Sequence, residues 1–300
     1  YSVTVLEALD QVGGRAGNWE KDGFRFDTGP SWYLMPEVFD HFYRLMGTSA
    51  DEQLDLQRLD PAYRVFFEPT GDDPASSVDV LADREANLDV FEQLEPGSRP
   101  AMEAYLDSAK ETYEIAKKYF LFTSFQDLRP LFVGEVLKRV GTLYKLLTRP
   151  IWGFAAKYVK SHRARQILGY PAVFLGSSPY MAPAMFHLMS YLDLEDGVLY
   201  AKGGFHAVMN SIRDIATDHG VDVRLNARVT QIHTSDDRKP RVEGVSYVDL
   251  DGVTHRVDAD IVVSGADLHH TETALLPPSL QTYGEQYWSK KVAGPSAVLM

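Results

Sequence analysis

The chain has 300 residues and a net charge of −12; 45% of its residues are hydrophobic, 24% are charged, and none is cysteine. The absence of cysteine excludes disulfide scaffolds, thiol catalysis and cysteine metal sites, and the acidic balance argues against general nucleic-acid binding. No apolar run in the sequence reaches the roughly 18 residues of a membrane-spanning helix, and the length fits about two domains.

The first segment, VTVLEALDQVGGRAG, combines a short apolar strand with a carboxylate and two adjacent glycines. Residues 3–6 predict a strand that ends at Glu7, and Gly13 and Gly14 allow a tight turn or a close approach of the backbone. An acid at the end of a strand is typical of the ribose-binding position in dinucleotide-binding folds. A solvated glutamate at a strand end would look the same, so Glu7 alone does not decide between the two.

In chain order the hydrophobic pattern then predicts a hairpin over 18–32, a helix over 36–47, strands at 64–68 and 77–81, and helical sequence over 87–118 with an interruption at 95–100. Residues 128–168 alternate apolar clusters with basic residues at helical spacing, and a helix over 205–220 leads into strands at 221–226, 228–234, 241–249 and 259–267. This order of α/β, helical and β-rich parts predicts two interleaved domains rather than two consecutive ones.

The charge is distributed unevenly along the chain. Residues 129–165 carry nine basic residues and one acidic residue, a local charge of +8, between acidic flanks. Bases interleaved with leucines and aromatic residues fit a segment that lies on anionic lipid. An amphipathic core helix with a solvated basic face has the same pattern, and the pattern alone favours this second interpretation.

Other segments are less specific. The stretch GYPAVFLGSSPYMAPAMFHLMSYL is rich in aromatic residues and methionine, as a wall for an apolar ligand or an ordinary buried core segment would be. His269 and His270 lack a partner at metal-ligand spacing, so we expect no metal site. The nucleophile-elbow, zinc-protease and phosphate-loop motifs are absent from the sequence.

Taken together, VTVLEALDQVGGRAG, GFRFDTGPS, SFQDL, AKGGFHAVMNSI, LNARVTQI and VVSGAD followed by His270 resemble the bacterial-type phytoene desaturases of the amine-oxidase-like flavoprotein superfamily. The resemblance covers nearly the whole chain. It implies an α/β fold in which an FAD-binding Rossmann-like (GR2-type) domain, residues 1–60 and 200–275, is interleaved with a substrate domain, residues 61–199 and 276–300. The substrate domain would hold a β-sheet and a helical part that faces the membrane.

The resemblance also implies roles for individual residues. FAD is the expected cofactor, with Glu7 on the ribose, Gly13 and Gly14 close to the cofactor, and Arg15 offsetting phosphate charge. By the same comparison both domains are incomplete, because a glycine-rich loop is expected before residue 1 and a larger C-terminal part after residue 300.

Four further positions match cofactor-binding segments of the family: Gly29 and Pro30 beside the flavin, Val229 pairing through its backbone with the adenine, and Asp267 after the last strand. Asp127 in SFQDL matches an acidic position near the substrate, where it would stabilise positive charge or take a proton. The family often has arginine where Gln126 stands, which puts a neighbouring charge in doubt.

The expected function is FAD-dependent desaturation of phytoene or a related carotenoid precursor at an anionic membrane surface, with quinone or oxygen as electron acceptor. The expected location is the cytoplasm, peripherally on the cell membrane, and no nucleic-acid partner is expected. A carotene ketolase, a carotenoid isomerase, an amine oxidase, and a lipid-binding scaffold without cofactor are alternatives. We expect the 300-residue chain by itself to be inactive and to hold little FAD.

Overall fold

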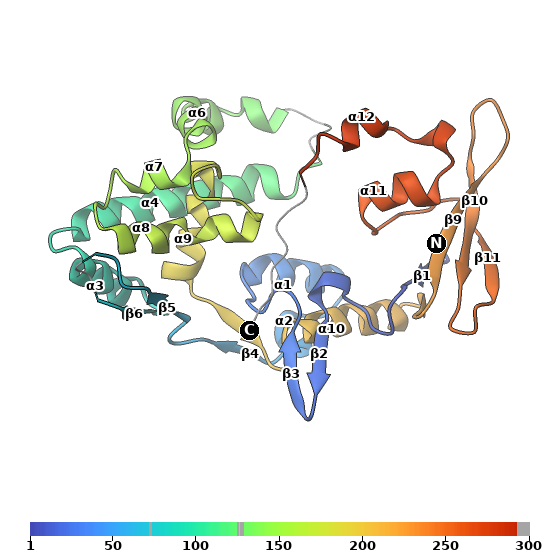
Figure 1. Ribbon diagram of the computed structural model, residues 1–300, viewed down its shortest axis with the longest axis horizontal. Coiled ribbons are helices and arrows are strands. Elements are labelled where there is room, and N and C mark those ends of the chain that lie inside the picture. The colour runs from blue at the N-terminus through green and yellow to red at the C-terminus, as the bar shows by residue number, and fades with distance from the viewer. Residues whose placement is uncertain (72–73, 125, 127–128, 293–300) are drawn as a thin grey trace.

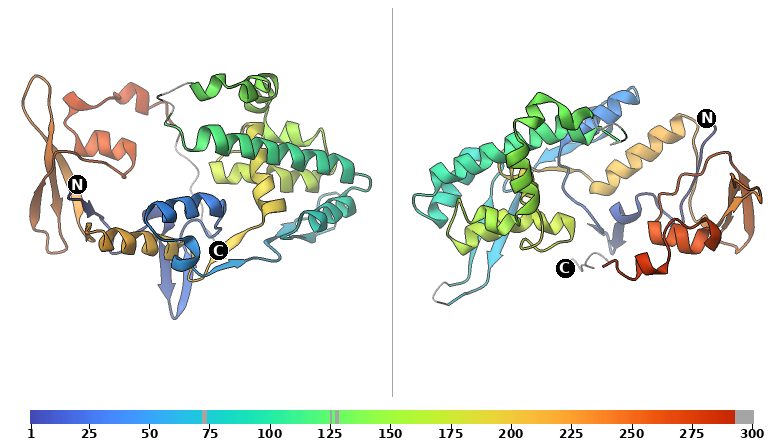
Figure 2. Two further views of the ribbon diagram at one scale, coloured as in Figure 1. Left: turned by 180° about the vertical axis from the view of Figure 1, so that it is seen from behind. Right: turned by 90° about the horizontal axis from the view of Figure 1, so that it is seen from above.

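The computed structural model describes residues 1–71, 74–124, 126 and 129–292. Helices and strands are mixed, with a helical lobe and a strand-rich lobe at opposite ends of the long axis (Figures 1 and 2). Between them lie α1 (Pro36–Leu45), α2 (Ala50–Gln53) and α10 (Phe205–Asp218). The mixed helix and strand content agrees with the prediction from sequence.

The helical lobe contains α3 (Arg84–Leu94), α4 (Arg99–Ala116), α5 (Gly134–Leu137), α6 (Val140–Thr148), α7 (Ile151–Ala155), α8 (His162–Gly169) and α9 (Met189–Tyr191). Its buried core includes Leu88, Phe91, Met102, Tyr105, Leu106, Phe154, Ile167 and Leu168. The predicted interruption is real: after α3 the carboxylate of Glu92 accepts hydrogen bonds from the backbone N–H groups of Gly97 (2.7 Å) and Arg99 (3.0 Å). These bonds fix the turn from which α4 starts.

The chain also forms three antiparallel strand pairs. They are β2 (Asn18–Lys21) with β3 (Phe24–Asp27), β4 (Leu56–Arg58) with β7 (Leu199–Ala201), and β5 (Tyr63–Phe67) with β6 (Ser76–Val80). The hairpins at β2–β3 and β5–β6 confirm the strands predicted there. Asp22 and Gly23 both have positive φ, which is the two-residue turn that a tight hairpin requires.

The centre is held by contacts between α1 and α10. The Tyr43 hydroxyl lies 2.6 Å from the Ser211 hydroxyl, and both side chains are buried. Tyr33 stacks on Phe39 with ring centroids 4.5 Å apart. Both helices are those predicted from the sequence, and their packing positions the segments that precede them.

The strand-rich lobe contains two sheets. β1 (Thr4–Leu6) pairs in parallel with β8 (Asp222–Arg224), and β9 (Arg228–Thr234), β10 (Val242–Val248) and β11 (Thr254–Asp258) form an antiparallel sheet in the order β11-β10-β9. The small helices α11 (Leu268–His270) and α12 (Glu285–Trp288) follow. Ile232, Val245 and Leu275 form its buried core.

For this lobe, the prediction from sequence omits one strand and wrongly includes another. Strand β11 was not predicted, because its sequence, THRVD, has little apolar character. Residues 259–267, predicted as a buried strand, pair with no strand in the described part of the chain, and Ile261 and Val263 are 67% and 88% exposed. An apolar run becomes a strand only where a neighbour satisfies its backbone groups, so Asp267 does not follow a buried strand.

Candidate functional site

Glu7 lies directly after β1, where its backbone N–H donates to the Arg224 carbonyl at 2.9 Å. The side-chain Oε1 accepts a hydrogen bond from the backbone N–H of Leu9 at 2.8 Å, and the side chain is partly exposed. This bond orients the carboxylate and leaves Oε2 available. The arrangement suits an acceptor for a hydroxyl group of a ligand.

The glycine turn and the GFRFDTGPS segment meet at backbone level. Gly13 has φ +102° and its carbonyl accepts a hydrogen bond from the N–H of Ala16 at 2.8 Å, and Gly14 has φ +52°. A Cβ added to Gly29 would lie 1.8 Å from the carbonyl oxygen of Arg15. The structure therefore brings the predicted residues 13–15 and 29–30 together, with the Arg15 side chain and Pro30 exposed.

Asp27 connects this region to α10. Its Oδ1 accepts a hydrogen bond from the backbone N–H of Phe205 at 3.0 Å, at the start of the helix. A Cβ on Gly204 would lie 2.3 Å from the same oxygen. Sequence reasoning missed this cap, although the glycine pair before the helix, Gly203 and Gly204, was a signal for a close neighbour.

Val229 lies in β9 opposite Tyr247 of β10, and it packs with Leu6 around the core of the lobe. Because Leu6 precedes Glu7, this packing brings the ends of the two predicted cofactor segments close together. A hollow of about 250 Å³ opens beside them, lined by Ala8, Asn226, Arg228, Val248, Asp249 and Leu250. Glu7 and Val229 do not line it themselves, but their chain neighbours Ala8 and Arg228 do.

Asp249 fixes one wall of this hollow. Its Oδ1 accepts hydrogen bonds from the backbone N–H groups of Asp251 (3.0 Å) and Val253 (2.9 Å), and its Oδ2 lies 2.6 Å from His255 Nε2. The hydrogen bond from His255, followed by the backbone bonds, lowers the pKa of Asp249. These bonds link the two ends of the β10–β11 turn. Sequence reasoning missed Asp249, whose side-chain partner His255 lies on the unpredicted strand and whose backbone partners lie in the turn before it.

Asp267 has a local role in the structure. It caps α11, with its Oδ1 accepting a hydrogen bond from the His270 N–H at 3.2 Å. Its carbonyl accepts hydrogen bonds from the N–H (2.8 Å) and hydroxyl (3.0 Å) of Thr271. None of its described contacts involves Glu7, Gly29 or Val229.

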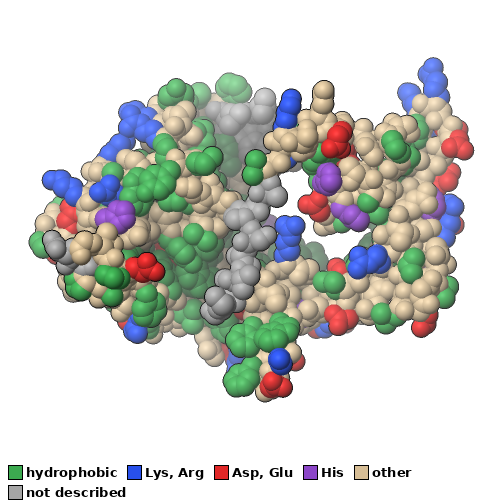
Figure 3. Space-filling model, viewed as in Figure 1, with side chains coloured by type: hydrophobic (Ala, Val, Ile, Leu, Met, Phe, Trp, Pro, Cys, Tyr) green, Lys and Arg blue, Asp and Glu red, His purple; other side chains and the backbone are tan. Residues whose placement is uncertain are grey.

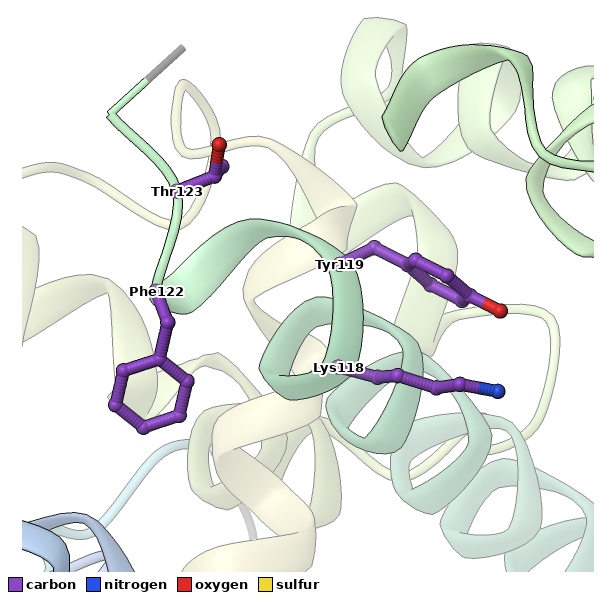
Figure 4. Close-up of a pocket in the computed structure, with 4 residues that line it drawn as sticks. All are labelled: Lys118, Tyr119, Phe122 and Thr123. Atoms are coloured by element: carbon purple, nitrogen blue, oxygen red, sulfur yellow. The ribbon is translucent and has the colours of Figure 1, made fainter. Parts of the chain in front are cut away.

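Asp127 lies outside the described residues. A π-helix, Lys117–Leu121, extends α4 a few residues earlier in the sequence. A hollow of about 180 Å³ lies at its end and is lined by Lys118, Tyr119, Phe122 and Thr123 (Figure 4). Lys118 and Tyr119 point the same way, and both contact Glu135 Oε2, at 2.9 and 2.5 Å. The bond from Tyr119, and then that from Lys118, lowers the pKa of Glu135.

The basic segment 129–165 is divided between internal contacts and solvent. Arg139 pairs with Glu111 (Nε to Oε1, 3.0 Å), and Arg163 and Arg165 cover the rings of Phe67 and Trp152. Within the described residues, Lys138, Lys145 and Arg149 form no ion pair. Burial, and then the charges of Arg149 and Lys145, lowers the pKa of Lys157, so these three cations lie close together.

The outer face of α6 is apolar. Val140, Tyr144 and Leu147, together with Leu137 at the end of α5, recur every three or four residues and are 47–68% exposed, while Leu146 faces the core. With Lys145 and Arg149, these residues form what we call the α6 surface. Leu146 packs in the core while the exposed side chains of this segment are both apolar and basic, so the structure does not decide between the two interpretations that the sequence left open.

The aromatic and methionine-rich stretch, residues 169–192, contains both buried and exposed residues. Pro171, Ala172, Ala182 and Ala184 are buried, whereas Val173, Phe174, Leu175, Tyr180 and Met181 are 40–78% exposed. Hydrophobic side chains gather on the visible face of the helical lobe and at the β2–β3 hairpin (Figure 3). The stretch therefore supplies both core and exposed apolar surface.

The described residues lack two kinds of feature. No three His, Asp or Glu side chains there are grouped as metal ligands would be. No helix there combines the length and the apolar character required for crossing a bilayer.

Comparisons with known proteins match this chain to flavoenzymes. It is 37% identical over 298 residues to the carotenoid 3,4-desaturase of Haloarcula japonica, covering 99% of this chain and 57% of that protein. It is 34% identical over 281 residues to the phytoene desaturase of Fusarium fujikuroi, covering 92% and 47%. An oxidoreductase structure from Methanosarcina mazei superposes with a TM-score of 0.57 at 13% identity, covering 91% of this chain and 55% of that one, which shows the fold alone.

The chain spans about half the length of the curated relatives it matches. The family profile described as "Flavin containing amine oxidoreductase" matches residues 1–291. The resemblance inferred from sequence motifs is thus confirmed, and the chain belongs to the flavin-containing amine oxidoreductase family.

Proposed function

We propose that the chain is part of an FAD-dependent desaturase that removes two hydrogens from phytoene or a related carotenoid precursor at a membrane surface. The observation that carries the proposal is the hollow of about 250 Å³ close to Glu7 and Val229, two residues that the resemblance to the family predicts to contact the cofactor. The desaturase names of the relatives support the reaction.

In this proposal Glu7 Oε2 accepts a ribose hydroxyl, and the backbone of Val229 meets the adenine. Gly13 and Gly14 allow close approach of the cofactor, Arg15 offsets phosphate charge, and Gly29 and Pro30 lie beside the flavin. The residues present fit the adenosine half, since an oriented carboxylate and a hollow stand side by side. When bound, the flavin supplies a two-electron acceptor. Asp267, a helix cap, would act only through the loop that it holds.

The domain division that follows is residues 1–60 and 200–275 for FAD, and 61–199 and 276–300 for the substrate. A polyene has no polar handle, so its binding depends on apolar burial. The exposed residues of the 173–181 stretch are suited to that role. Asp127 would take the proton that the reacting carbon pair loses.

Membrane association follows from the substrate, which dissolves in lipid. The α6 surface offers apolar side chains for the acyl boundary and cations for anionic headgroups. The enzyme would work in the cytoplasm on the inner surface of the cell membrane, with quinone or oxygen as final electron acceptor.

The test uses the complete protein, supplied with phytoene in liposomes, with flavin content read by absorbance and products by chromatography. We expect bound FAD and coloured products with longer conjugation. Glu7→Gln should weaken FAD binding about tenfold, since hydrogen bonds to a charged group contribute roughly 1.5–3 kcal/mol. The exposed Glu68→Gln is the matched control.

Asp127→Asn should retain FAD and lose most turnover, with the exposed Asp236→Asn as its control. Ketone products would indicate a ketolase, rearranged double bonds an isomerase, and peroxide from amines an amine oxidase. Any of these outcomes, or a complete protein without flavin, would overturn the desaturase proposal.

A further inference from the structure

Four aromatic rings from three distant segments meet in the helical lobe. Trp32, shortly after Pro30, contacts Tyr63 of β5, with centroids 5.0 Å apart, and Phe174, 5.6 Å apart. Tyr170, in the 3-10 helix Tyr170–Leu175, contacts the other three at 5.4–5.9 Å. We call these four residues the ring cluster.

The ring cluster has a buried carboxylate behind it. Asp193, in the π-helix Leu192–Asp196, is 4% exposed, and its Oδ2 accepts a hydrogen bond from the Tyr63 hydroxyl at 2.8 Å. Its Oδ1 is buried and has no hydrogen-bond partner within the described part of the chain. An acceptor left unpaired in the interior is costly, so a group kept in this state invites a functional explanation.

The ring cluster also has an accessible face. Phe174 is 46% exposed, and its neighbours Val173 and Leu175 are 61% and 40% exposed. Trp32 comes two residues after Pro30, in the segment proposed to lie beside the flavin. The ring cluster thus joins an exposed apolar face to the reacting end of the proposed cofactor site.

We propose that the ring cluster is the wall of the substrate site that contacts the polyene next to the flavin. Its π-faces stabilise the positive charge that develops on the polyene during the reaction. Asp193 acts as a positioning residue, because its hydrogen bond holds the ring of Tyr63 in place. This inference rests on the proposed function. In the reaction one C–H bond would yield its hydrogen with both electrons to the flavin, the two-electron acceptor that the proposed function supplies. The adjacent C–H yields a proton to the base, assigned above to Asp127, and its electron pair closes the new double bond. Aromatic faces attract the cation that exists between these two events.

Asp193 adds a negative charge when ionised. Burial raises its pKa to about 7, and burial followed by the charge of Asp193 raises the pKa of Tyr170. The titratable groups that face it are Tyr63 from β5, Tyr170 from the 3-10 helix and Tyr105 from α4. On its own π-helix, Glu195 is held by Arg84 and Lys110, and burial raises the pKa of Asp196.

The test replaces single rings in the complete protein. We expect Trp32→Leu and Phe174→Leu to lower kcat about tenfold with KM for phytoene changed less than about threefold, because leucine keeps the apolar contact and loses the π-face. Phe66→Leu is the matched control, since Phe66 lies on β5 near Tyr63 and is 76% exposed with no ring contact in the described structure. Equal effects of Phe174→Leu and Phe66→Leu would overturn the proposal.

A binding measurement separates this inference from the proposed function. Lycopene, a coloured polyene, should quench tryptophan fluorescence in the wild type, and Trp32→Phe should remove most of that quenching. Undiminished quenching in Trp32→Phe would overturn the ring cluster as the wall even if desaturation is observed. Asp193→Asn should remove the change in kcat that the wild type shows near pH 7, and it should leave lycopene binding intact. An unchanged dependence of kcat on pH would overturn the positioning role of Asp193.

Discussion

Gly29 occupies a position where no side chain fits. A Cβ would lie 1.8 Å from the Arg15 carbonyl oxygen, so Gly29→Ala must push the two segments apart. We expect it to lower the free energy of unfolding by about 2 kcal/mol, the usual scale for overpacking. Gly134→Ala is the control, because nothing lies within 4 Å of its added Cβ. Urea unfolding of both variants checks this, and equal midpoints would contradict it.

Asp193 gives the protein a pH-dependent stability. Burial raises its pKa to about 7, whereas an unfolded aspartate titrates near 4. Between about pH 4 and 7 the folded state keeps a proton that the unfolded chain has released, so this group's contribution to stability falls as pH rises and levels off above 7.

Asp193→Asn cannot ionise and keeps an acceptor for Tyr63. Its stability relative to the wild type should therefore increase by a few kcal/mol from about pH 4 to 7, at about 1.4 kcal/mol per pKa unit. Thermal unfolding across this range is the measurement, with Asp236→Asn as control. A constant difference between variant and wild type would refute the assignment.

At the scale of elements, the α6 surface predicts lipid binding that depends on salt. The complete protein should sediment with phosphatidylglycerol vesicles at low salt and less at high salt, since each cation near an anionic surface contributes about 1 kcal/mol. Lys145→Glu with Arg149→Glu should lower the partition constant at least tenfold. Arg238→Glu with Lys239→Glu, on the exposed β9–β10 turn, is the charge-matched control. Equal binding of both double variants would contradict the proposed surface.

Elements with a strong local pattern were predictable. The apolar periodicity of α1 and α10 and the turn residues of the β2–β3 hairpin are properties of neighbouring residues. The prediction of a strand at 259–267 is wrong because strand formation depends on a pairing neighbour. Strand β11 was not predicted, because its pairing with β10 outweighs the polar character of its sequence. Hydrophobic periodicity depends only on the residues of one segment, so it does not identify the strand with which that segment pairs.

At the scale of the whole molecule, the lobes differ in core size. Among the described residues, the largest buried cluster of the helical lobe has sixteen members, whereas that of the strand-rich lobe consists of Ile232, Val245 and Leu275. In hydrogen exchange, amides of α4 should therefore be protected longest, and those of β1 and β8 should exchange earlier. Exchange measured by mass spectrometry checks this order. Equal protection of α4 and β1 would contradict it.

The candidate site depends on the same long-range packing. Glu7, Val229 and the glycines were predicted from motifs. The Asp27–Phe205 and Tyr63–Asp193 hydrogen bonds, in contrast, join residues far apart in the sequence, and the Asp249–His255 contact depends on a strand that was not predicted. In the sequence alone, nothing distinguishes the carboxylates of Asp27, Asp249 and Asp193 from those of ordinary surface residues.

The contact between Gly29 and Arg15 is made by backbone atoms alone. A substitution at position 15 can therefore change the charge presented to a ligand while the joint between the two segments stays intact. This backbone contact does not restrict the side chain at position 15, but it requires glycine at position 29. Variants designed to change cofactor preference should therefore vary residue 15 and keep Gly29.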